Sequence, residues 1–195
     1  MRRSADGGEA RRLLGIGEDQ QAVLYAPTWR DNVRNASGSY ELVSHFDAAR
    51  AASRLEDQVF LLRGHSNVAE QRFTAAQRHS LDVTSYPDVT DLYLAADALV
   101  TDYSSVMFDF CVTGKPLYFL TPDLEQYRDS VRGFYFDFES EAPGPLVRTT
   151  DELVDAMSTP QVGQTSEAYE AFRNRFAALD DGGASARVVR AVWER

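Results

Sequence analysis

Short runs of consecutive apolar residues recur along the chain, and each has the length of a strand that is buried on both faces. Polar residues, glycine or proline follow these runs, so each strand is expected to end in a turn. The runs that predict strands are Ala22–Ala26, Val59–Leu62, Leu81–Thr84, Ala98–Val100, Leu117–Leu120 and Leu146–Arg148.

The segments between these runs carry apolar residues at helical spacing. Strands and helices therefore alternate over most of the chain, with short connections. This alternation predicts an α/β fold, a doubly wound parallel sheet (Rossmann-like) with helices on both faces. The segments predicted as helices are 45–56, Thr90–Ala96, Val106–Val112, Asp123–Asp129, 150–157 with Thr150 as its cap, 166–178 and Ala186–Trp193.

The first part of the chain does not continue this pattern. Residues 1–21 are polar and charged, and their glycines interrupt any apolar periodicity. We therefore expect a linker segment at 1–21 and a folded domain over 22–195. A chain of 195 residues is long enough for one domain with a sizeable core.

The stretch Ala95–Leu120 contains a strand, a polar turn, a helix and a second strand, which is a βαβ unit. The turn holds Ser104 and Ser105 directly before the helix. Free N–H groups and the positive end of the helix dipole make such a point suitable for a phosphate, and the two hydroxyls add donors. The alternative is that Ser104 simply caps the helix, which serine often does.

Polar residues follow four of the predicted strands. Because the carboxyl ends of parallel strands meet at one edge of the sheet, where ligands of doubly wound folds bind, these residues are expected to lie together. An isolated arginine or histidine in such a place is usually structural, but convergence of several favours an anion site. The residues are Thr28 and Arg30, Arg63 and His65, Tyr86–Val89, and Asp102–Ser105.

Charge and motifs narrow the possible functions. The formal net charge of −10 argues against a nucleic-acid partner and against a basic membrane-binding patch. The chain has neither a P-loop nor a GxGxxG fingerprint, and no Cys/His metal spacing. Asp102 has no second acidic residue at DxD spacing, so no metal site is expected. The single cysteine, Cys111, is expected to be a core residue in a reducing compartment.

Several segments carry a family resemblance. The chain resembles the CDP-glycerol:poly(glycerophosphate) glycerophosphotransferases, the polymerases and primases of bacterial cell-wall teichoic-acid synthesis, and similar enzymes use CDP-ribitol. The match extends over nearly the whole chain after about residue 22. The segments that carry it are Ala26–Asp31, Arg63–His65, Asp88–Phe110, Tyr127–Pro145 and Asp181–Val189.

The resemblance implies a GT-B architecture, in which two Rossmann-like domains face each other across a cleft. Residues 22–195 look like the second domain, which binds the nucleotide donor. The first domain, which binds the acceptor polymer, would precede Met1, and this piece alone is expected to bind donor without turning it over. The family also implies a cytoplasmic enzyme, peripheral at the inner face of the membrane, whose membrane contact would lie outside this chain.

The resemblance further implies a reaction without a cofactor. An acceptor hydroxyl attacks the β-phosphorus of CDP-glycerol, CMP leaves, and glycerol phosphate joins a polyol-phosphate polymer or primer. His65 matches the catalytic histidine on the donor side, as hydrogen-bond donor or general acid toward CMP. Ser104, Ser105 and the N–H of Val106 would hold the pyrophosphate, with Arg63 and Arg30 as countercharge. The alternative for Arg63 is an ion pair with a nearby acidic residue.

The remaining candidate contacts concern the nucleoside and the acceptor. Asp109 is placed to bind the ribose hydroxyls, or is an exposed helix charge. Pro87 and Val89 would meet the cytosine through backbone groups. Arg128 and Arg132 are candidates for phosphate or acceptor contacts, and Thr28 for a substrate contact.

Two other functions remain open. One is a GT-B glycosyltransferase domain that uses a UDP-sugar, because the unit around Thr101–Phe110 is shared across GT-B enzymes. The other is a nucleotide-binding module without catalysis. The sequence leaves undecided whether the polyol is glycerol or ribitol, and whether the enzyme is a primase or a polymerase.

Overall fold

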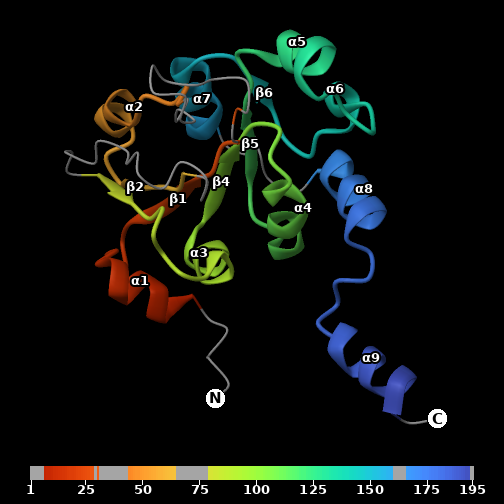
Figure 1. Ribbon diagram of the computed structural model, residues 1–195. Helices are drawn as coiled ribbons and strands as arrows, with labels where there is room; N and C mark the ends of the chain where they lie inside the picture. Colours follow the sequence, from red (N-terminus) through yellow and green to blue (C-terminus); the bar gives the residue numbers. More distant parts are fainter. Residues whose placement is uncertain (1–6, 29, 31–43, 65–78, 160–165, 194–195) are drawn as a thin grey trace, which may run out of the picture.

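The fold is built on a parallel sheet. The computed structural model describes residues 7–28, 30, 44–64, 79–159 and 166–193. These form a six-stranded sheet of order β3-β2-β1-β4-β5-β6 (Figure 1). The strands are β1 Gln21–Tyr25, β2 Gln58–Leu62, β3 Ser80–Asp82, β4 Ala98–Thr101, β5 Leu117–Leu120 and β6 Leu146–Val147.

All neighbouring strands pair in parallel. The order reverses at β1, which pairs with β2 on one side, Val23 opposite Phe60, and with β4 on the other, Val23 opposite Ala98. Such a reversal is the topological switch point at which ligands of doubly wound sheets bind. The predicted strands are confirmed, with ends that differ by one or two residues.

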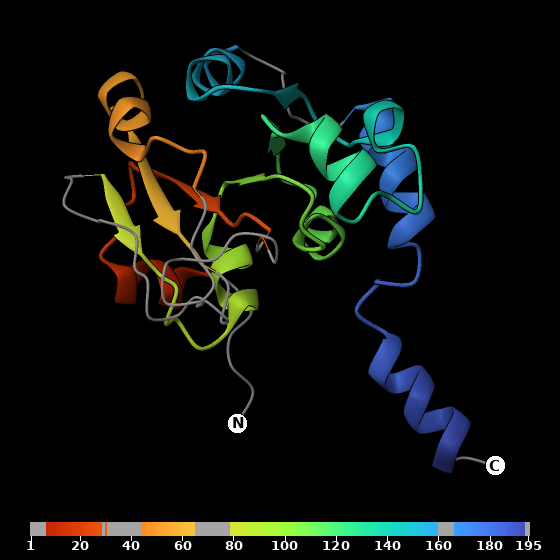
Figure 2. The ribbon, with the colours of Figure 1, turned by 45° about the horizontal axis from the view of Figure 1, so that its top comes forward.

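Helices cover both faces of the sheet (Figures 1 and 2). The helices α2 and α7 lie on one face, and α3, α4 and α8 on the other. The helical segments are α1 Gly8–Leu14, α2 Ala48–Arg54, α3 Val89–Ala95, α4 Val106–Phe110 continued by a 3₁₀ turn Cys111–Thr113, α5 Leu124–Gln126, a π-helical segment Tyr127–Val131, α6 Phe138–Glu141, α7 Thr150–Ser158, α8 Glu167–Phe176 and α9 Ala184–Trp193.

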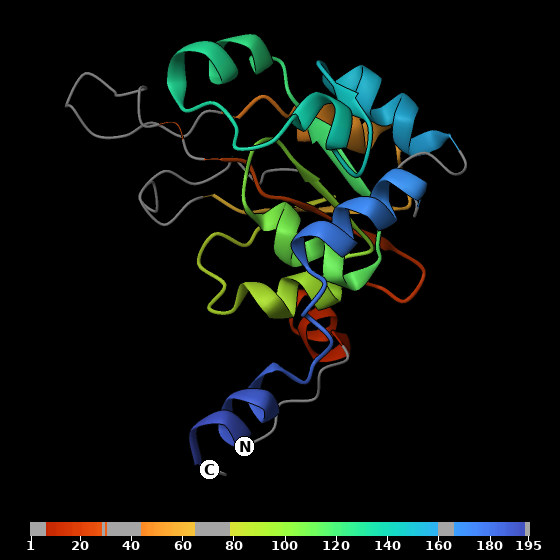
Figure 3. The same cartoon turned by 90° about the vertical axis from the view of Figure 1, so that its right-hand side faces the viewer.

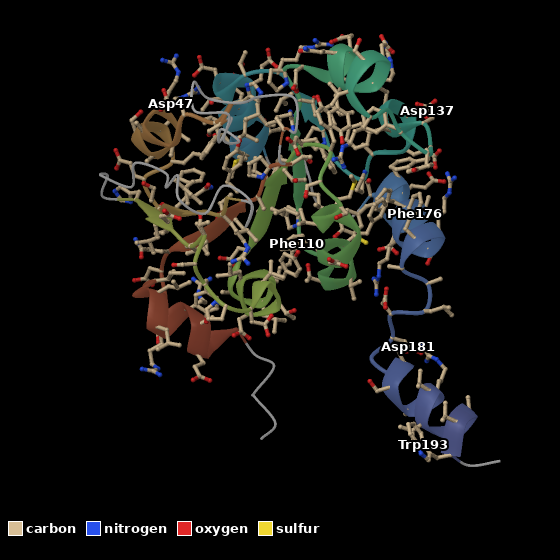
Figure 4. The ribbon with its side chains drawn as sticks, in the orientation of Figure 1. Asp47, Phe110, Asp137, Phe176, Asp181 and Trp193 are labelled. Atoms are coloured by element: carbon tan, nitrogen blue, oxygen red, sulfur yellow. The ribbon has the colours of Figure 1, made fainter. Side chains whose placement is uncertain are left out.

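The core has two layers because successive side chains of a strand point to opposite faces. In β1, Ala22 and Leu24 belong to the layer under α3 and α4, whereas Val23 and Tyr25 belong to the layer under α2 and α7. Phe110 lies fully buried in the first layer (Figure 4). Burial on both faces is why the central strands are apolar without interruption.

Aromatic rings hold α8 against α4. The rings of Phe108 and Phe172 stack with centroids 5.5 Å apart. Phe136 and Phe176 complete the cluster, with centroids 5.0 Å apart. The loop that carries Phe136 is therefore attached to the domain by its aromatic side chains, and Phe176 lies at the side of α8 that faces it (Figure 4).

The segment before β1 is more ordered than its sequence suggested. It contains α1, which packs against α3 and so belongs to the described fold, and the role of 1–21 as a linker stays a prediction. The Arg11 guanidinium donates 2.9 Å hydrogen bonds to the Ala95 carbonyl and to Asp97 Oδ2. Gly7 stands at the start of α1 with φ 62°, against the end of α3.

Several helix ends differ from the prediction. The cap of α7 is Thr149, whose Oγ1 accepts the Glu152 N–H at 3.2 Å, while Thr150 instead accepts the N–H of Asp47 at 3.0 Å. Asp47 in turn caps α2, which starts later than expected (Figure 4). The helix α6, within the aromatic segment, was not predicted.

The last helix stands apart from the rest of the domain (Figure 3). None of its residues is buried. Its apolar side chains Val188, Val192 and Trp193 are exposed, and Trp193 lies at its far end (Figure 4). Among the described helices, none has the length and apolar character needed to cross a bilayer.

Candidate anion-binding site at the carboxyl edge of the sheet

The topology brings the candidate residues to one edge of the sheet. Thr28 and Arg30 follow β1, Arg63 follows β2, and Asp102–Ser105 follow β4, the strand beside β1. The loop Val83–Asp88 follows β3. His65, the predicted catalytic histidine, lies outside the described residues.

The turn after β4 carries the two serines. Helix α4 begins after Ser105, which makes no side-chain capping hydrogen bond. The first helical bonds run from the Met107 N–H to the Ser104 carbonyl and from the Phe108 N–H to the Ser105 carbonyl. Ser104 is half-buried and Ser105 exposed. The simpler alternative, a helix cap by the Ser104 hydroxyl, is therefore not formed, and phosphate binding by this turn stays a prediction.

The Arg30 side chain is hydrogen-bonded to other groups of the protein. Its side chain is 4% exposed. The Nε and Nη2 atoms donate to the two carboxylate oxygens of Asp123, at 3.1 and 3.2 Å. Nη1 donates to the Thr28 carbonyl at 2.9 Å and lies 3.0 Å from Asp102 Oδ2. Every nitrogen of the guanidinium thus has a partner within the protein, and its predicted use as countercharge for a phosphate stays a prediction.

Two carboxylates, those of Asp102 and Asp123, face the single guanidinium of Arg30. Burial opposes ionisation of Asp123, but the hydrogen bonds and charge of Arg30 outweigh it and lower the pKa of this carboxyl. Burial, followed by the Asp123 charge, raises the pKa of the Tyr103 hydroxyl. Tyr103 is therefore protonated and donates to Asp123 Oδ1 at 3.1 Å.

Arg63 has a different environment from Arg30. Its Nη1 donates to the carbonyls of Val83, at 3.1 Å, and Tyr86, at 3.0 Å. Within the described ranges, no acidic side chain forms an ion pair with it, and its Nε and Nη2 have no hydrogen bond there. Burial lowers the pKa of this half-buried guanidinium. Arg63 is thus a partly desolvated cation with donors left for a ligand.

The loop after β3 is held by β2. Besides the Arg63 bonds, the Gly64 N–H donates to Thr84 Oγ1 at 2.9 Å. Asp88 caps α3 by accepting the Thr90 N–H at 2.9 Å. Pro87 is exposed, and Val89 is the first residue of α3. The predicted base contacts of Pro87 and Val89 therefore come from an ordered loop at the correct edge, and they stay predictions.

The other candidates lie on the surface. Asp109 is exposed on α4 and has no ion pair with any described residue. Its charge acts with burial, the larger effect, to raise the pKa of Tyr93 to about 12. Arg128 is exposed and paired with Asp129 and Glu139, so its charge is already balanced. Arg132 is exposed at the end of the π-helical segment.

Sequence reasoning missed one polar residue at this edge. Asp123 follows β5 at the same edge of the sheet, a position that the strand-end argument could have marked. The Thr28 Oγ1 atom is buried without a hydrogen-bond partner in the described chain. No group of three or more potential metal ligands occurs within the residues that the structure describes.

The fold and this edge define the class of protein. The sheet order and its switch point are those of a Rossmann-like domain of the GT-B type. A family model described as CDP-Glycerol:Poly(glycerophosphate) glycerophosphotransferase matches residues 1–194. The chain belongs to this family.

Curated relatives agree with the family assignment. The chain is 42% identical to the teichoic acid glycerol-phosphate transferase of Staphylococcus aureus, over 93% of this chain and 47% of that protein. It is 40% identical to the teichoic acid poly(glycerol phosphate) polymerase of Bacillus spizizenii, over 92% of this chain and 46% of that protein. The chain thus spans about half the length of these relatives.

Solved structures confirm the fold. The wall teichoic acid polymerase TagF matches with a TM-score of 0.82 and 33% identity, over 93% of this chain and 45% of that chain. A variant of that polymerase soaked with CDPG matches with a TM-score of 0.78 and 32% identity, over 93% of this chain and 44% of that chain. The predicted doubly wound α/β domain of the GT-B type is therefore confirmed.

Proposed function

We propose that this chain is the donor-binding domain of a transferase that moves glycerol phosphate from CDP-glycerol to a teichoic-acid polymer or primer and releases CMP. The family and the names of the relatives support this donor and product. The observation that carries the proposal in this chain is Arg63, a half-buried guanidinium without a carboxylate partner in the described structure. It lies at the edge where a doubly wound sheet binds its ligand.

The proposed reaction forms a bond between the acceptor hydroxyl oxygen and the β-phosphorus of the donor. The acceptor hydroxyl gives up its proton to a general base, the bond from that phosphorus to the oxygen of CMP breaks, and negative charge grows on the departing phosphate. Donors placed around that phosphate stabilise the transition state more than the bound substrate. We assign this task to Arg63, to the hydroxyls of Ser104 and Ser105, and to the N–H of Val106.

His65 follows Arg63 by two positions, and we propose that it donates a hydrogen bond or a proton to the leaving CMP. Pro87 and Val89 would contact the cytosine. Asp109 would bind the ribose hydroxyls, and Thr28 Oγ1, which is buried without a partner, would gain one from the ligand.

Binding of the acceptor polymer requires parts of the protein beyond the described domain. We propose that the polyol-phosphate polymer is held mainly by the part of the relatives that this chain does not cover, with Arg128 and Arg132 as contacts from this side. The same part would carry the attachment to the inner face of the cytoplasmic membrane. We further propose that the transfer needs no cofactor, because the acceptor hydroxyl, the donor substrate and the assigned protein groups supply everything that the reaction needs.

A UDP-sugar glycosyltransferase domain and a nucleotide-binding module without catalysis are the competing proposals. Calorimetric titration with CDP-glycerol, CDP-ribitol, CMP and UDP-glucose distinguishes them by the ligand preferred. We expect CDP-glycerol to bind most tightly. A preference for UDP-glucose would favour the glycosyltransferase, and binding of all cytidine nucleotides without turnover by the full-length enzyme would favour the module.

The Arg63→Met variant tests the residue that carries the proposal. The loss of a charge-assisted hydrogen bond removes about 1.5–3 kcal/mol, which weakens CDP-glycerol binding about 10- to 100-fold. Arg175→Met is the matched control, since Arg175 is an exposed arginine on α8 that pairs with Glu141 at the end of α6. Equal affinity in wild type and Arg63→Met would contradict the assignment.

A further inference from the structure

Charged side chains link the ends of three strands beside the serine turn. We infer that Arg30, Asp102, Asp123 and Tyr103 form a positioning network that holds the turn Ser104–Ser105 in place for the donor pyrophosphate, and that Arg30 does not contact the donor. The inference rests on the proposed function, because it concerns how that donor site is kept in shape.

Asp102 fastens the turn after β4 to the loop after β1. Its Oδ1 atom accepts the N–H of Thr28 at 2.7 Å and the N–H of Tyr103 at 2.6 Å. Its Oδ2 atom lies 3.0 Å from Arg30 Nη1. The residue is 3% exposed, so these bonds are shielded from water and are correspondingly strong.

Asp123 fastens the same turn from the end of β5. Its carboxylate accepts hydrogen bonds from the Tyr103 hydroxyl and from Nε and Nη2 of Arg30. The rings of Tyr103 and Tyr127 stack with centroids 4.2 Å apart, and the Arg30 guanidinium carbon lies 5.3 and 5.4 Å from the two ring centroids. Tyr103, which directly precedes Ser104, is thus held by its backbone, its hydroxyl and its ring.

The balance of charge around Arg30 favours a positioning role for this residue over direct contact with the phosphate. One guanidinium faces two carboxylates, so a phosphate would have to compete with both for the donors of Arg30 and would meet an excess of negative charge. The serines lie one and two residues beyond this network, and the Ser105 side chain makes no capping hydrogen bond. A site that must match a pyrophosphate closely gains affinity when such supporting bonds fix its backbone beforehand.

The test compares ligands with and without phosphates. Dissociation constants for CDP and for cytidine are measured for wild type, Tyr103→Phe and Asp123→Asn, with thermal unfolding recorded for each. Tyr169→Phe is the matched control. Its buried hydroxyl donates to the Lys115 carbonyl at 2.8 Å, at the opposite end of β5 from the proposed site, so it loses a comparable bond elsewhere.

We expect CDP affinity to fall about tenfold in Tyr103→Phe and in Asp123→Asn, with cytidine affinity unchanged and Tyr169→Phe like wild type for both ligands. Direct phosphate binding by Arg30 predicts the opposite sign for Asp123→Asn, because a less neutralised guanidinium would bind CDP more tightly. That result, an unchanged CDP affinity, or an equal loss for cytidine would overturn the inference. Failure of wild type to bind CDP would instead overturn the proposed function.

Discussion

Replacing Arg30 with methionine gives the most direct measure of the buried charge network. Methionine keeps an unbranched apolar stem beside the stacked rings of Tyr103 and Tyr127, so packing changes little. The substitution removes the cation that faces Asp102 and Asp123, whose side chains are 4% and 22% exposed. Two carboxylates are then left close together with their main counter-ion gone.

The expected loss follows from that arrangement. Removing one partner of a buried ion pair destabilises a protein by about 3–5 kcal/mol. Because Asp123 keeps some contact with water, we expect the lower end, about 3 kcal/mol at neutral pH. Asp123→Asn should lose only about 1 kcal/mol, because it leaves one guanidinium opposite one carboxylate. The order of the two variants is therefore part of the prediction.

The sign of the pH dependence provides a second check. In wild type the pKa of Asp123 is lowered, so its contribution is present above the ordinary carboxyl pKa and is lost as pH falls through the lowered value. In Arg30→Met, burial and the neighbouring carboxylate raise the pKa of Asp123. Stability then rises as pH falls toward the ordinary carboxyl range, about pH 4. The deficit of the variant should shrink on acidification.

Urea unfolding followed by far-ultraviolet circular dichroism at a series of pH values measures both effects. Arg175→Met, which breaks an exposed ion pair, should change stability by less than about 1 kcal/mol throughout. A deficit of Arg30→Met below about 1 kcal/mol at neutral pH, or one that grows on acidification, would refute the reasoning.

Four further variants probe the rest of the domain. Gly7→Ala should lower the free energy of unfolding in urea by about 2 kcal/mol or more, because φ is +62° and a Cβ would meet the Leu94 carbonyl oxygen at 2.4 Å. Gly182→Ala, where φ is +78° but nothing lies within 4 Å, should lose only about 1 kcal/mol in the same assay. Deleting 184–195 should leave the calorimetric unfolding midpoint within about 2 °C of wild type, since α9 buries no residue. Tyr169→Phe should lose about 1 kcal/mol of unfolding free energy with its buried hydroxyl bonds.

The sheet could be predicted from the sequence because its central strands are buried on both faces. The ends of an apolar run such as Leu117–Leu120 are easy to predict because polar or turn-forming residues lie on either side of it, and this run coincides with β5. Helix starts were less certain where neighbouring residues have equal capping ability. Thr149 and Thr150 can both cap, and the choice depends on the tertiary bond from Asp47 to Thr150.

Helix α1 shows the limit of local patterns. Its glycines and charges lack an apolar stripe, and only Ala10 is buried within it. The bonds that hold it run from Arg11 to Ala95 and Asp97, which lie far along the chain. Because tertiary contacts rather than its own periodicity stabilise this helix, sequence reasoning described the segment as a linker.

Arg30 and Arg63 show why the sequence could predict that both lie at the carboxyl edge of the sheet, but could not predict which of them is neutralised by carboxylates. Arg30 and Arg63 both follow a buried strand, and nothing near either in the sequence distinguishes them. The carboxylates that neutralise Arg30 come from the ends of β4 and β5, Asp123 being 93 residues away. Arg63 lies between the ends of β2 and β3, where its hydrogen bonds to described residues go to the carbonyl oxygens of Val83 and Tyr86. Desolvating a cation without a counter-ion is unfavourable, and an arriving anion relieves that penalty. Of these two arginines, Arg63, which has no ion pair with a described residue, is therefore the one suited to meet the charge of an anionic ligand.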